Sequence, residues 1–175
     1  MSFGDFTPVT LASLKRRSGL KLRDGRRLIK DLYGERPHGR IHDKLEASAK
    51  SFFSRRKFSI FPHHISVGDH FAWADFAAAR FRRVILVECL VGWSDRNLGA
   101  TIEGKMSLRA ECELWFAVGP DGKDYLKCFG YKARQIPSGD LSFWICWPPG
   151  AKLPNKAPQP TTTSVMPRAN ESRIE

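Results

Sequence analysis

The chain has 175 residues, of which 42% are apolar, and with five Trp and twelve Phe it can build one sizeable core. Its formal net charge of +11 favours polyanionic partners, such as nucleic acid or an acidic membrane surface. The longest uncharged apolar run, 141–151, is about half the ~20 residues that a spanning helix needs, so we expect no transmembrane segment.

The positive charge is concentrated in the N-terminal third. Residues 1–57 hold fifteen Lys and Arg against six Asp and Glu, whereas residues 58–175 hold fourteen against twelve. The first residues have neither the basic nor the apolar region of a secretory leader, so we expect an intracellular, reducing location, cytoplasmic or nuclear.

Three helices are predicted in this basic arm. A short one begins after Thr10 and stops at Gly19, a second covers 25–33 with Asp24 as its cap, and a third covers 41–54. The third is the most amphipathic, because apolar residues recur at spacings of three and four: Ile41, Leu45, Ala49 and Phe52.

Residues 58–81 are predicted to form a short edge strand followed by a helix. Residues 58–60 precede Pro62 and suit an edge strand. The alanine-rich segment 70–81 favours a helix, which we expect to pack an aromatic face on the sheet.

A run of strands is predicted next. Residues 84–93 are apolar on both faces apart from Glu88, as in a central strand. Residues 105–118 alternate strictly between apolar and polar, which predicts a strand with one buried face and one wet face.

The rest of the sheet is predicted as a hairpin and a last strand. Residues 119–122 form a turn, and 123–134 return as the partner strand. A four-residue loop places Tyr125, Lys127 and Phe129 on the core face, and a five-residue loop places Leu126 and Cys128 there. We favour the second register because it leaves Lys127 in water. Residues 141–147 form the last strand.

These elements predict an α+β fold. A basic helical N-terminal region (1–57) packs on a mainly antiparallel sheet, a meander or small β-sandwich, within a β-rich core that includes one helix (58–147). The final segment, 148–175, is rich in proline and threonine and almost free of apolar residues, so we expect a disordered tail.

The basic arm is the strongest functional signal. Lys and Arg neutralise phosphates and release counterions, which supplies most of the sequence-independent affinity for nucleic acid. A solubilising surface or a nuclear-import signal is the alternative interpretation. The candidate contacts are Lys15, Arg16, Arg17, Arg26, Arg27, Lys30, Arg55, Arg56 and Lys57.

Trp115 completes the candidate nucleic-acid site. The alternation of its strand places it on the polar face, where it could stack on a base. A Trp at such a position is more often buried by a neighbouring helix or by a dimer partner, and that alternative stays open.

Catalytic, metal and cofactor sites are not predicted. The spacing of His63, His64 and His70 matches no metal-ligand pattern, and the four cysteines lack zinc-site spacing. Each cysteine falls in a different predicted strand, so we expect reduced, core-facing thiols rather than a nucleophile. No phosphate-binding loop or nucleophile-elbow motif occurs.

The segment 87–109 resembles the core of plant-virus movement proteins of the thirty-kilodalton superfamily. In that family a strand ending near a glycine is followed by a polar loop, a glycine and a second strand. The hallmark Asp after the second strand is absent here, where Ser107-Leu108-Arg109-Ala110-Glu111 stands. The resemblance implies a viral protein and a strand after the loop.

The sequence therefore predicts a non-enzymatic nucleic-acid-binding accessory protein, with RNA favoured over DNA. Viral genome movement, packaging or silencing suppression would suit such a protein. The alternative is a protein-interaction adaptor whose aromatic sheet face binds a host or sister protein while the basic arm serves localisation. Both interpretations leave room for a homo-oligomer.

Overall fold

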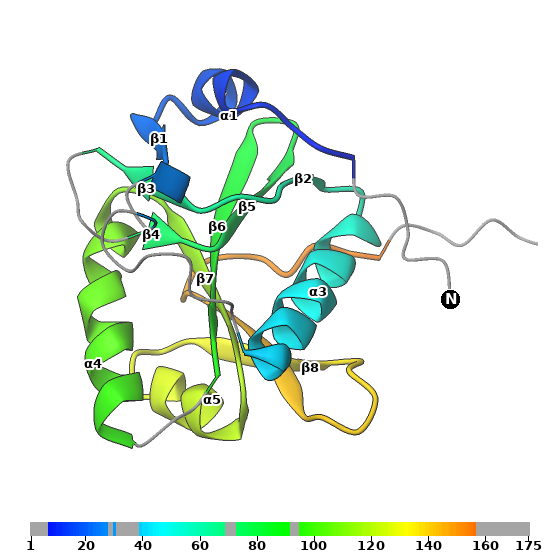
Figure 1. The fold of residues 1–175 in the computed structure, drawn as a ribbon, viewed down its shortest axis with the longest axis vertical. Helices are drawn as coiled ribbons and strands as arrows, with labels where there is room; N and C mark the ends of the chain where they lie inside the picture. The colour runs from blue at the N-terminus through cyan, green and yellow to red at the C-terminus, as the bar shows by residue number, and fades with distance from the viewer. Residues whose placement is uncertain (1–6, 28–29, 31–38, 69–72, 92–94, 157–175) are drawn as a thin grey trace, which may run out of the picture.

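A computed structural model describes residues 7–27, 30, 39–68, 73–91 and 95–156, without the side chains at 95–97 and 110. Its centre is a six-stranded mixed sheet with helices on both faces (Figure 1). The helices are α1 (Leu11–Ser18), α3 (Arg40–Ser54), α4 (Asp95–Met106), the 3-10 helix η1 (Ser107–Ala110) and α5 (Pro120–Lys127). The strands are β1 (Leu22–Asp24), β2 (Ser59–Phe61), β3 (Ile65–Val67), β4 (Trp73–Ala74), β5 (Phe76–Arg80), β6 (Arg83–Leu90), β7 (Glu113–Val118), β8 (Lys132–Ile136) and β9 (Phe143–Trp147).

The large sheet has the strand order β2-β5-β6-β7-β9-β8. Its neighbouring strands are antiparallel except β6 and β7, which run parallel and are connected through α4. A second, three-stranded antiparallel sheet has the order β1-β3-β4. The predicted α+β class and the mainly antiparallel sheet are confirmed.

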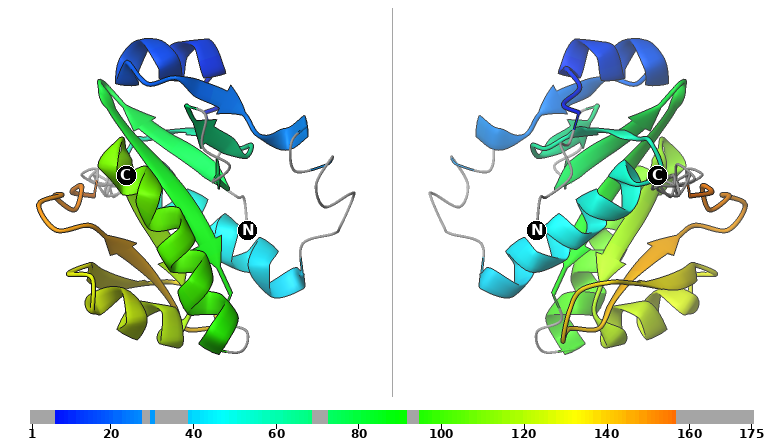
Figure 2. Two further views of the ribbon diagram at one scale, coloured as in Figure 1. Left: turned by 90° about the vertical axis from the view of Figure 1, so that its left-hand side faces the viewer. Right: turned by 90° about the vertical axis from the view of Figure 1, so that its right-hand side faces the viewer.

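The sheet divides the core into two layers, with α4 and α3 on opposite sides of it (Figure 1). Figure 2 looks onto the sheet from the α4 side in its left view and from the α3 side in its right view. Alternate residues of β6 enter different layers: Leu86 contacts the layer under α1, α4 and α5, whereas Ile85 and Val87 contact the layer under α3. Both faces are therefore buried, which explains why 84–90 is almost uniformly apolar.

The predicted helices at 11–18 and 41–54 are confirmed, within one residue. The Thr10 side chain accepts a hydrogen bond from the Ser13 N–H (3.2 Å), and Gly19 ends α1 with φ +69°. The predicted helix 25–33 falls largely outside the described residues. Asp24, its predicted cap, is the last residue of β1 and accepts a hydrogen bond from the Arg26 N–H (3.0 Å).

The helix predicted over 70–81 is wrong, because β4 and β5 occupy the described part of that segment. Ala77, Ala78 and Ala79 are each 0–1% exposed inside the sheet. Their small side chains let the layers approach both faces closely, so packing overrides the helix propensity of alanine.

The strand predicted over 105–118 is also wrong over 105–110, where α4 ends and η1 follows; only Glu113–Val118 is a strand. A parallel neighbour needs a crossover connection, and α4 supplies it. The resemblance to movement proteins implied a strand where α4 lies.

Neither register of the predicted hairpin occurs. Residues 120–127 form α5, with Pro120 in its first turn, and β8 pairs with β9 instead of β7. The last strand is confirmed as β9.

The predicted C-terminal tail contacts the core over its described part. The Lys152 carbonyl accepts a hydrogen bond from Arg83 (2.8 Å), and the Pro154 carbonyl accepts one from Arg56 (3.0 Å). Residues 157–175 lie outside the described residues. Of the helices in the described part of the chain, none has the length and apolar character needed to cross a bilayer.

Candidate functional site

Five buried or half-buried polar side chains lie around the strand pair β5 and β6. We call them the buried polar cluster: His42, His64, Asp75, Glu88 and Lys105. The two carboxylates, Asp75 and Glu88, are each 5% exposed. The pairing of Phe76 with Val87 makes Asp75 and Glu88 neighbours across the two strands.

Backbone groups of β6 fix Asp75. Its N–H donates to the Val87 carbonyl (2.9 Å), and its Oδ2 accepts from the Cys89 N–H (2.7 Å). The carboxylate is thus held at the start of β5 with little freedom to reorient.

Two histidines flank Asp75. His42 Nε2 lies 3.1 Å from the Cys89 carbonyl and 3.7 Å from Asp75 Oδ2, and His64 Nδ1 lies 3.3 Å from Asp75 Oδ1. Burial opposes charge on both partners, but their mutual attraction outweighs it: the pKa of Asp75 is lowered and the pKa of His42 is raised. Asp75 is therefore ionised at neutral pH, and protonation of His42 is favoured.

Glu88 is the polar residue in the otherwise apolar strand β6, and Lys105 of α4 reaches it. Lys105 Nζ lies 3.0 Å from Glu88 Oε1; it also donates to the Trp73 carbonyl and sits 4.8 Å from the centroid of the Trp73 ring. Glu88 Oε2 is buried and has no hydrogen-bond partner among the described residues. Burial and the nearby charge of Asp75 raise the pKa of Glu88 to about 8, against the opposing effect of Lys105.

The cluster therefore holds two neighbouring carboxyl groups whose pKa values are moved in opposite directions. Such a separation is typical of sites that exchange protons near neutral pH, where one group stays ionised and the other can carry the proton. No three His, Cys, Asp or Glu side chains in the described ranges could hold a metal ion by themselves. A Mg²⁺ site needs fewer protein ligands, because one or two carboxylates are usually completed by water molecules and substrate phosphates.

Some of the predicted cationic contacts lie beside this cluster. The Gly25 N–H donates to the His64 carbonyl (2.8 Å), so the exposed Arg26 and Arg27 follow directly after this contact. Arg26 is paired with Asp24 (2.6 Å). Lys30 is exposed as well.

The other predicted cations lie on α1 and on the turn after α3. Lys15 and Arg16 are exposed on α1, Arg17 is half-buried, and Arg55 and Lys57 are exposed on the turn after α3. Arg80, at the end of β5, donates to the Arg56 carbonyl (3.3 Å), which connects that turn to the β5–β6 hairpin.

Two predicted contact residues, Arg56 and Trp115, are inside the protein. Arg56 is 3% exposed, stacks 3.6 Å from the Phe52 ring centroid and donates to the Phe52 and Pro154 carbonyls. Trp115 is 0% exposed and its indole N–H donates to Glu113 Oε1 (2.8 Å). Neither side chain can meet a nucleic acid in this conformation, so both are removed from the candidate site.

The cysteines only partly follow the prediction. All four are free; Cys89 and Cys146 are buried in strands, but Cys112 is half-buried just before β7, and Cys128 is exposed after α5. Burial raises the pKa of Cys112 and Cys146 to about 12, which makes these thiols poor nucleophiles.

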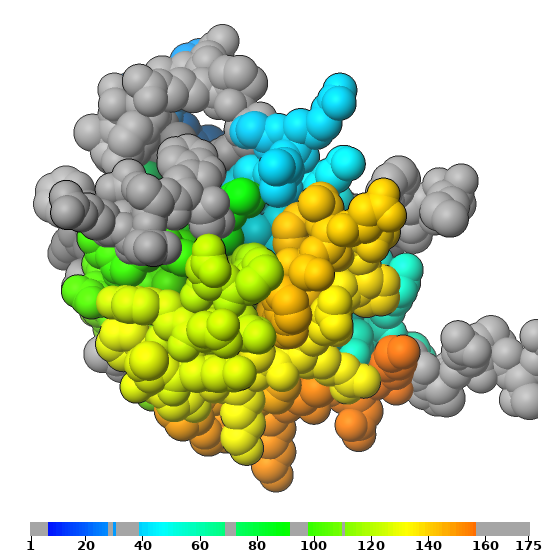
Figure 3. Space-filling view, turned by 90° about the horizontal axis from the view of Figure 1, so that it is seen from below, coloured from blue at the N-terminus to red at the C-terminus, as the bar shows by residue number. Residues whose placement is uncertain are grey.

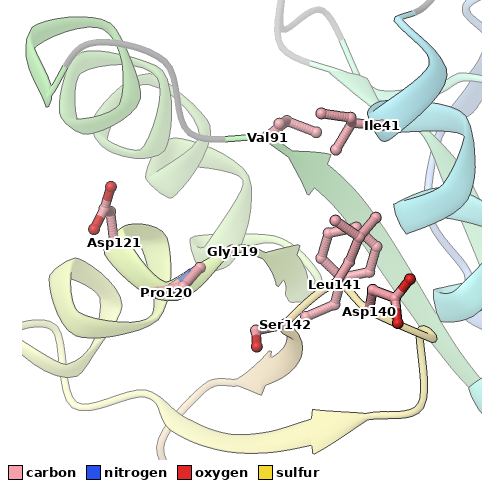
Figure 4. Close-up of a pocket in the computed structure, with 9 residues that line it drawn as sticks. Ile41, Val91, Gly119, Pro120, Asp121, Asp140, Leu141 and Ser142 are labelled. Atoms are coloured by element: carbon pink, nitrogen blue, oxygen red, sulfur yellow. The ribbon is translucent and has the colours of Figure 1, made fainter.

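An open depression of about 260 Å³ lies beyond the carboxyl ends of β6 and β7. It is bounded by the start of α3, the first turn of α5 and the β8–β9 connection, which meet on the face shown in Figure 3. Ile41 and Val91 face each other on one side, and Asp121 lies on the opposite side (Figure 4). None of the buried polar cluster lines this depression.

Sequence reasoning missed most of the cluster. Lys105 was predicted on the wet face of a strand, Asp75 was predicted in a helix where the structure has strands, and His42 was not singled out. Glu88 carried a usable signal, because a single carboxylate inside an apolar central strand must find a partner. Among the predicted histidines, only His64 joins the cluster, and His70 lies outside the described residues.

Comparisons with known proteins add no relative: no family model, no curated protein and no solved structure matches this chain.

Proposed function

We propose that this protein binds nucleic acid through its exposed Lys and Arg residues. The supporting observation is that adjoining segments, distant in sequence, carry exposed cations, which we call the basic end: Lys15, Arg16, Arg55, Lys57 and Arg82. Residues 11–18, 55–57 and 80–83 contribute three Lys or Arg each and no Asp or Glu.

Two contacts bring these segments together. Helix α1 packs against β6 and lies beside the end of the β5–β6 hairpin (Figure 1), and Arg80 donates to the carbonyl of Arg56. A surface with several exposed cations and few carboxylates attracts a phosphate backbone irrespective of sequence. RNA stays the partner predicted from the sequence. A viral accessory role also stays a prediction.

Salt dependence tests this proposal. Affinity for a labelled RNA strand and for a labelled DNA strand is measured against the NaCl concentration. About four phosphate contacts predict a slope of log K against log salt of about −3. Binding that is absent at low salt, or that has a slope near zero, would overturn it.

A second candidate function is favoured by the buried polar cluster: hydrolysis of phosphodiester bonds in the bound nucleic acid. This departs from the non-enzymatic role predicted from the sequence. Its motivation is the unpaired, buried oxygen of Glu88 beside the ionised Asp75, a carboxylate pair that a hard divalent cation would neutralise. Exposed Arg26 and Arg27 nearby would hold substrate phosphates.

The groups of the cluster suit such a reaction. Asp75 and Glu88 would hold a Mg²⁺ ion, which would supply an activated water for attack on phosphorus. A carboxylate would take the proton of that water as the P–O bond to the leaving oxygen breaks, and the leaving oxygen would take a proton from water or from a protonated side chain. The ammonium group of Lys105, held against Glu88, would stabilise the negative charge that develops on the phosphoryl oxygens.

Cleavage assays test the second function. Wild type, Asp75→Asn and Lys105→Met are purified in parallel and incubated with labelled single and double strands, with MgCl2 or with EDTA. Glu103→Gln, an exposed residue of α4, is the matched control. We expect cleavage by wild type and the control with Mg²⁺ only. Equal cleavage by all four proteins, or none by wild type, would reject the candidate without affecting the binding proposal.

The adaptor alternative stays a prediction, although most of the aromatic side chains that motivated it are buried and Trp144 is half-buried. Trp115, Phe143 and Trp147 are 0–8% exposed because they pack in the layer under α3. A protein partner stays a prediction, but these side chains cannot anchor it in this conformation.

A further inference from the structure

The β5–β6 hairpin presents an exposed aromatic ring at its tip. Arg80 pairs with Arg83, so Phe81 and Arg82 form a two-residue turn. Phe81 is 82% exposed. Its side chain therefore makes almost no contribution to the core.

Phe81 also has a conformation that suits glycine. Its φ is +52°, in the left-handed region, at the first position of a two-residue hairpin turn. Among the non-glycine residues that the structure describes, Phe81 shares a positive φ only with Lys57. A bulky residue that is both strained and exposed gains nothing from folding, and such positions cluster at functional sites.

The two strained residues lie on adjoining turns. Arg80 donates to the Arg56 carbonyl, one residue before Lys57, and its guanidinium lies 5.6 Å from the Phe81 ring centroid. Arg55, Lys57 and Arg82 are exposed on these two adjoining turns. Arg83 is instead paired with Glu113 (2.5 Å). The tip thus presents an exposed aromatic ring with one guanidinium against it and further exposed cations on the same turn and the adjoining one.

We propose that Phe81 stacks on an unpaired base of a single-stranded nucleic acid while Arg55, Lys57 and Arg82 bind the adjoining phosphates. This inference rests on the proposed nucleic-acid binding and adds a preference for single strands to it. Stacking platforms with cations beside them are the usual means of holding single strands without sequence readout. Phe81 here takes the role that the sequence had suggested for Trp115.

The chemistry of the tip favours a single strand over a duplex or a lipid surface. The faces of bases are covered by their neighbours in a duplex and are free in a single strand. Insertion into a bilayer interface needs an extended apolar face. The exposed large hydrophobic residues of the described chain are Ile41 and Phe81 alone, and they belong to different elements.

Binding of single-stranded and duplex RNA by Phe81→Ala tests the inference, with fluorescence anisotropy as the readout. We expect about ten-fold weaker binding of the single strand, an unchanged salt slope and unchanged duplex affinity. Phe81→Trp should restore the single-strand affinity because it keeps an aromatic face. Ile41→Ala, at the other exposed hydrophobic residue, should change neither affinity.

The outcomes separate this inference from the function on which it rests. If wild type binds neither nucleic acid, the proposed function fails. If wild type binds both and Phe81→Ala binds both equally well, the role of Phe81 is overturned while nucleic-acid binding stands. If wild type sediments with phosphatidylserine vesicles, Phe81→Ala does not, and RNA affinities are unchanged, the tip binds lipid and the inference is also overturned.

Discussion

The raised pKa of Glu88 gives the protein a pH-dependent stability that can be measured. The usual pKa of a glutamate, 4.5, is raised to about 8 in the folded protein by burial and by Asp75. Between these two values the folded state binds more protons than the unfolded state. The contribution of Glu88 to stability is therefore fully present below pH 4.5 and is lost as pH rises toward 8.

The magnitude follows from proton linkage. One proton held only by the folded state corresponds to about 1.4 kcal/mol per pH unit. From about pH 5 to pH 6.5, Glu88 should lower the free energy of unfolding by about 2 kcal/mol. Within this window the lowered pKa of His63, which burial and Arg26 cause, acts in the opposite direction below its usual 6.5, so the effect of Glu88 is read as the difference between wild type and Glu88→Gln. The lowered pKa of Asp75 acts below its usual 3.8, and the raised pKa of His42 acts above its usual 6.5, where it also lowers stability as pH rises.

The perturbation is Glu88→Gln, assayed by urea unfolding at several pH values in that window. The variant loses the carboxylate that pairs with Lys105, which shifts its stability at every pH, but the decline due to Glu88 should disappear. Glu103→Gln makes the same change at an exposed site and should keep the wild-type slope. Parallel curves for wild type and Glu88→Gln would refute the reasoning.

Magnesium extends the same experiment. A cation at Asp75 and Glu88 would favour the ionised form of Glu88, so MgCl2 should flatten the wild-type decline and raise its stability near neutral pH. The stability of Glu88→Gln should change less than that of wild type when MgCl2 is added. An equal response of the two proteins would argue against a cation at these carboxylates.

Three further predictions concern side chains inside the protein. Trp115→Ala should lower the free energy of unfolding by about 3–5 kcal/mol in urea titration, because it opens a cavity between Phe53 and Trp147; a loss below about 1 kcal/mol would contradict its burial. Arg56→Leu should cost about 2–3 kcal/mol because two carbonyls lose their donor, whereas Arg55→Leu should stay within about 0.5 kcal/mol. Equal effects of these two substitutions would show that Arg56 is not buried. Gly122→Ala should lower the free energy of unfolding by about 1–3 kcal/mol, because its Cβ would lie 2.8 Å from Val118 Cβ. Gly104→Ala is the control: its Cβ has open space, so it should raise the free energy of unfolding by about 0.5–1 kcal/mol. If both substitutions shift the thermal unfolding midpoint in the same direction, the packing of α5 on β7 is contradicted.

The sequence was sufficient where local pattern and packing agree. Helix α3 was predicted from its apolar stripe, and β6 was predicted from a run that is apolar on both faces. Prediction from the sequence failed where packing overrides the local conformational preference of the residues. Ala77–79 are helix-forming residues that the sheet needs for their small size. Residues 105–110 alternate like a strand, but a parallel neighbour requires a helix there.

The sequence predicted the positive charge of the candidate nucleic-acid site but not the arrangement of its side chains. The sequence identified Lys15, Arg16, Arg55 and Lys57, which are exposed, but it could not show that Arg56 turns inward. Five segments of the chain, at positions 42, 64, 75, 88 and 105, supply the buried polar cluster, so no spacing rule could find it. Phe81 was hidden for a different reason: a turn with a bulky residue at positive φ has no sequence signature, since glycine is expected there.

The central claim, that nucleic acid binds the basic end, is tested most directly by comparing two variants with equal net charge. One replaces Lys15, Arg16, Arg55 and Lys57 by Gln, and the other replaces the exposed Arg40, Lys44, Lys127 and Lys132. The first should lose about one unit of salt slope for each phosphate contact removed, together with most of its affinity at low salt. The second should bind nearly as wild type does. Equal losses in the two variants would mean that total charge, and not the basic end, binds the nucleic acid.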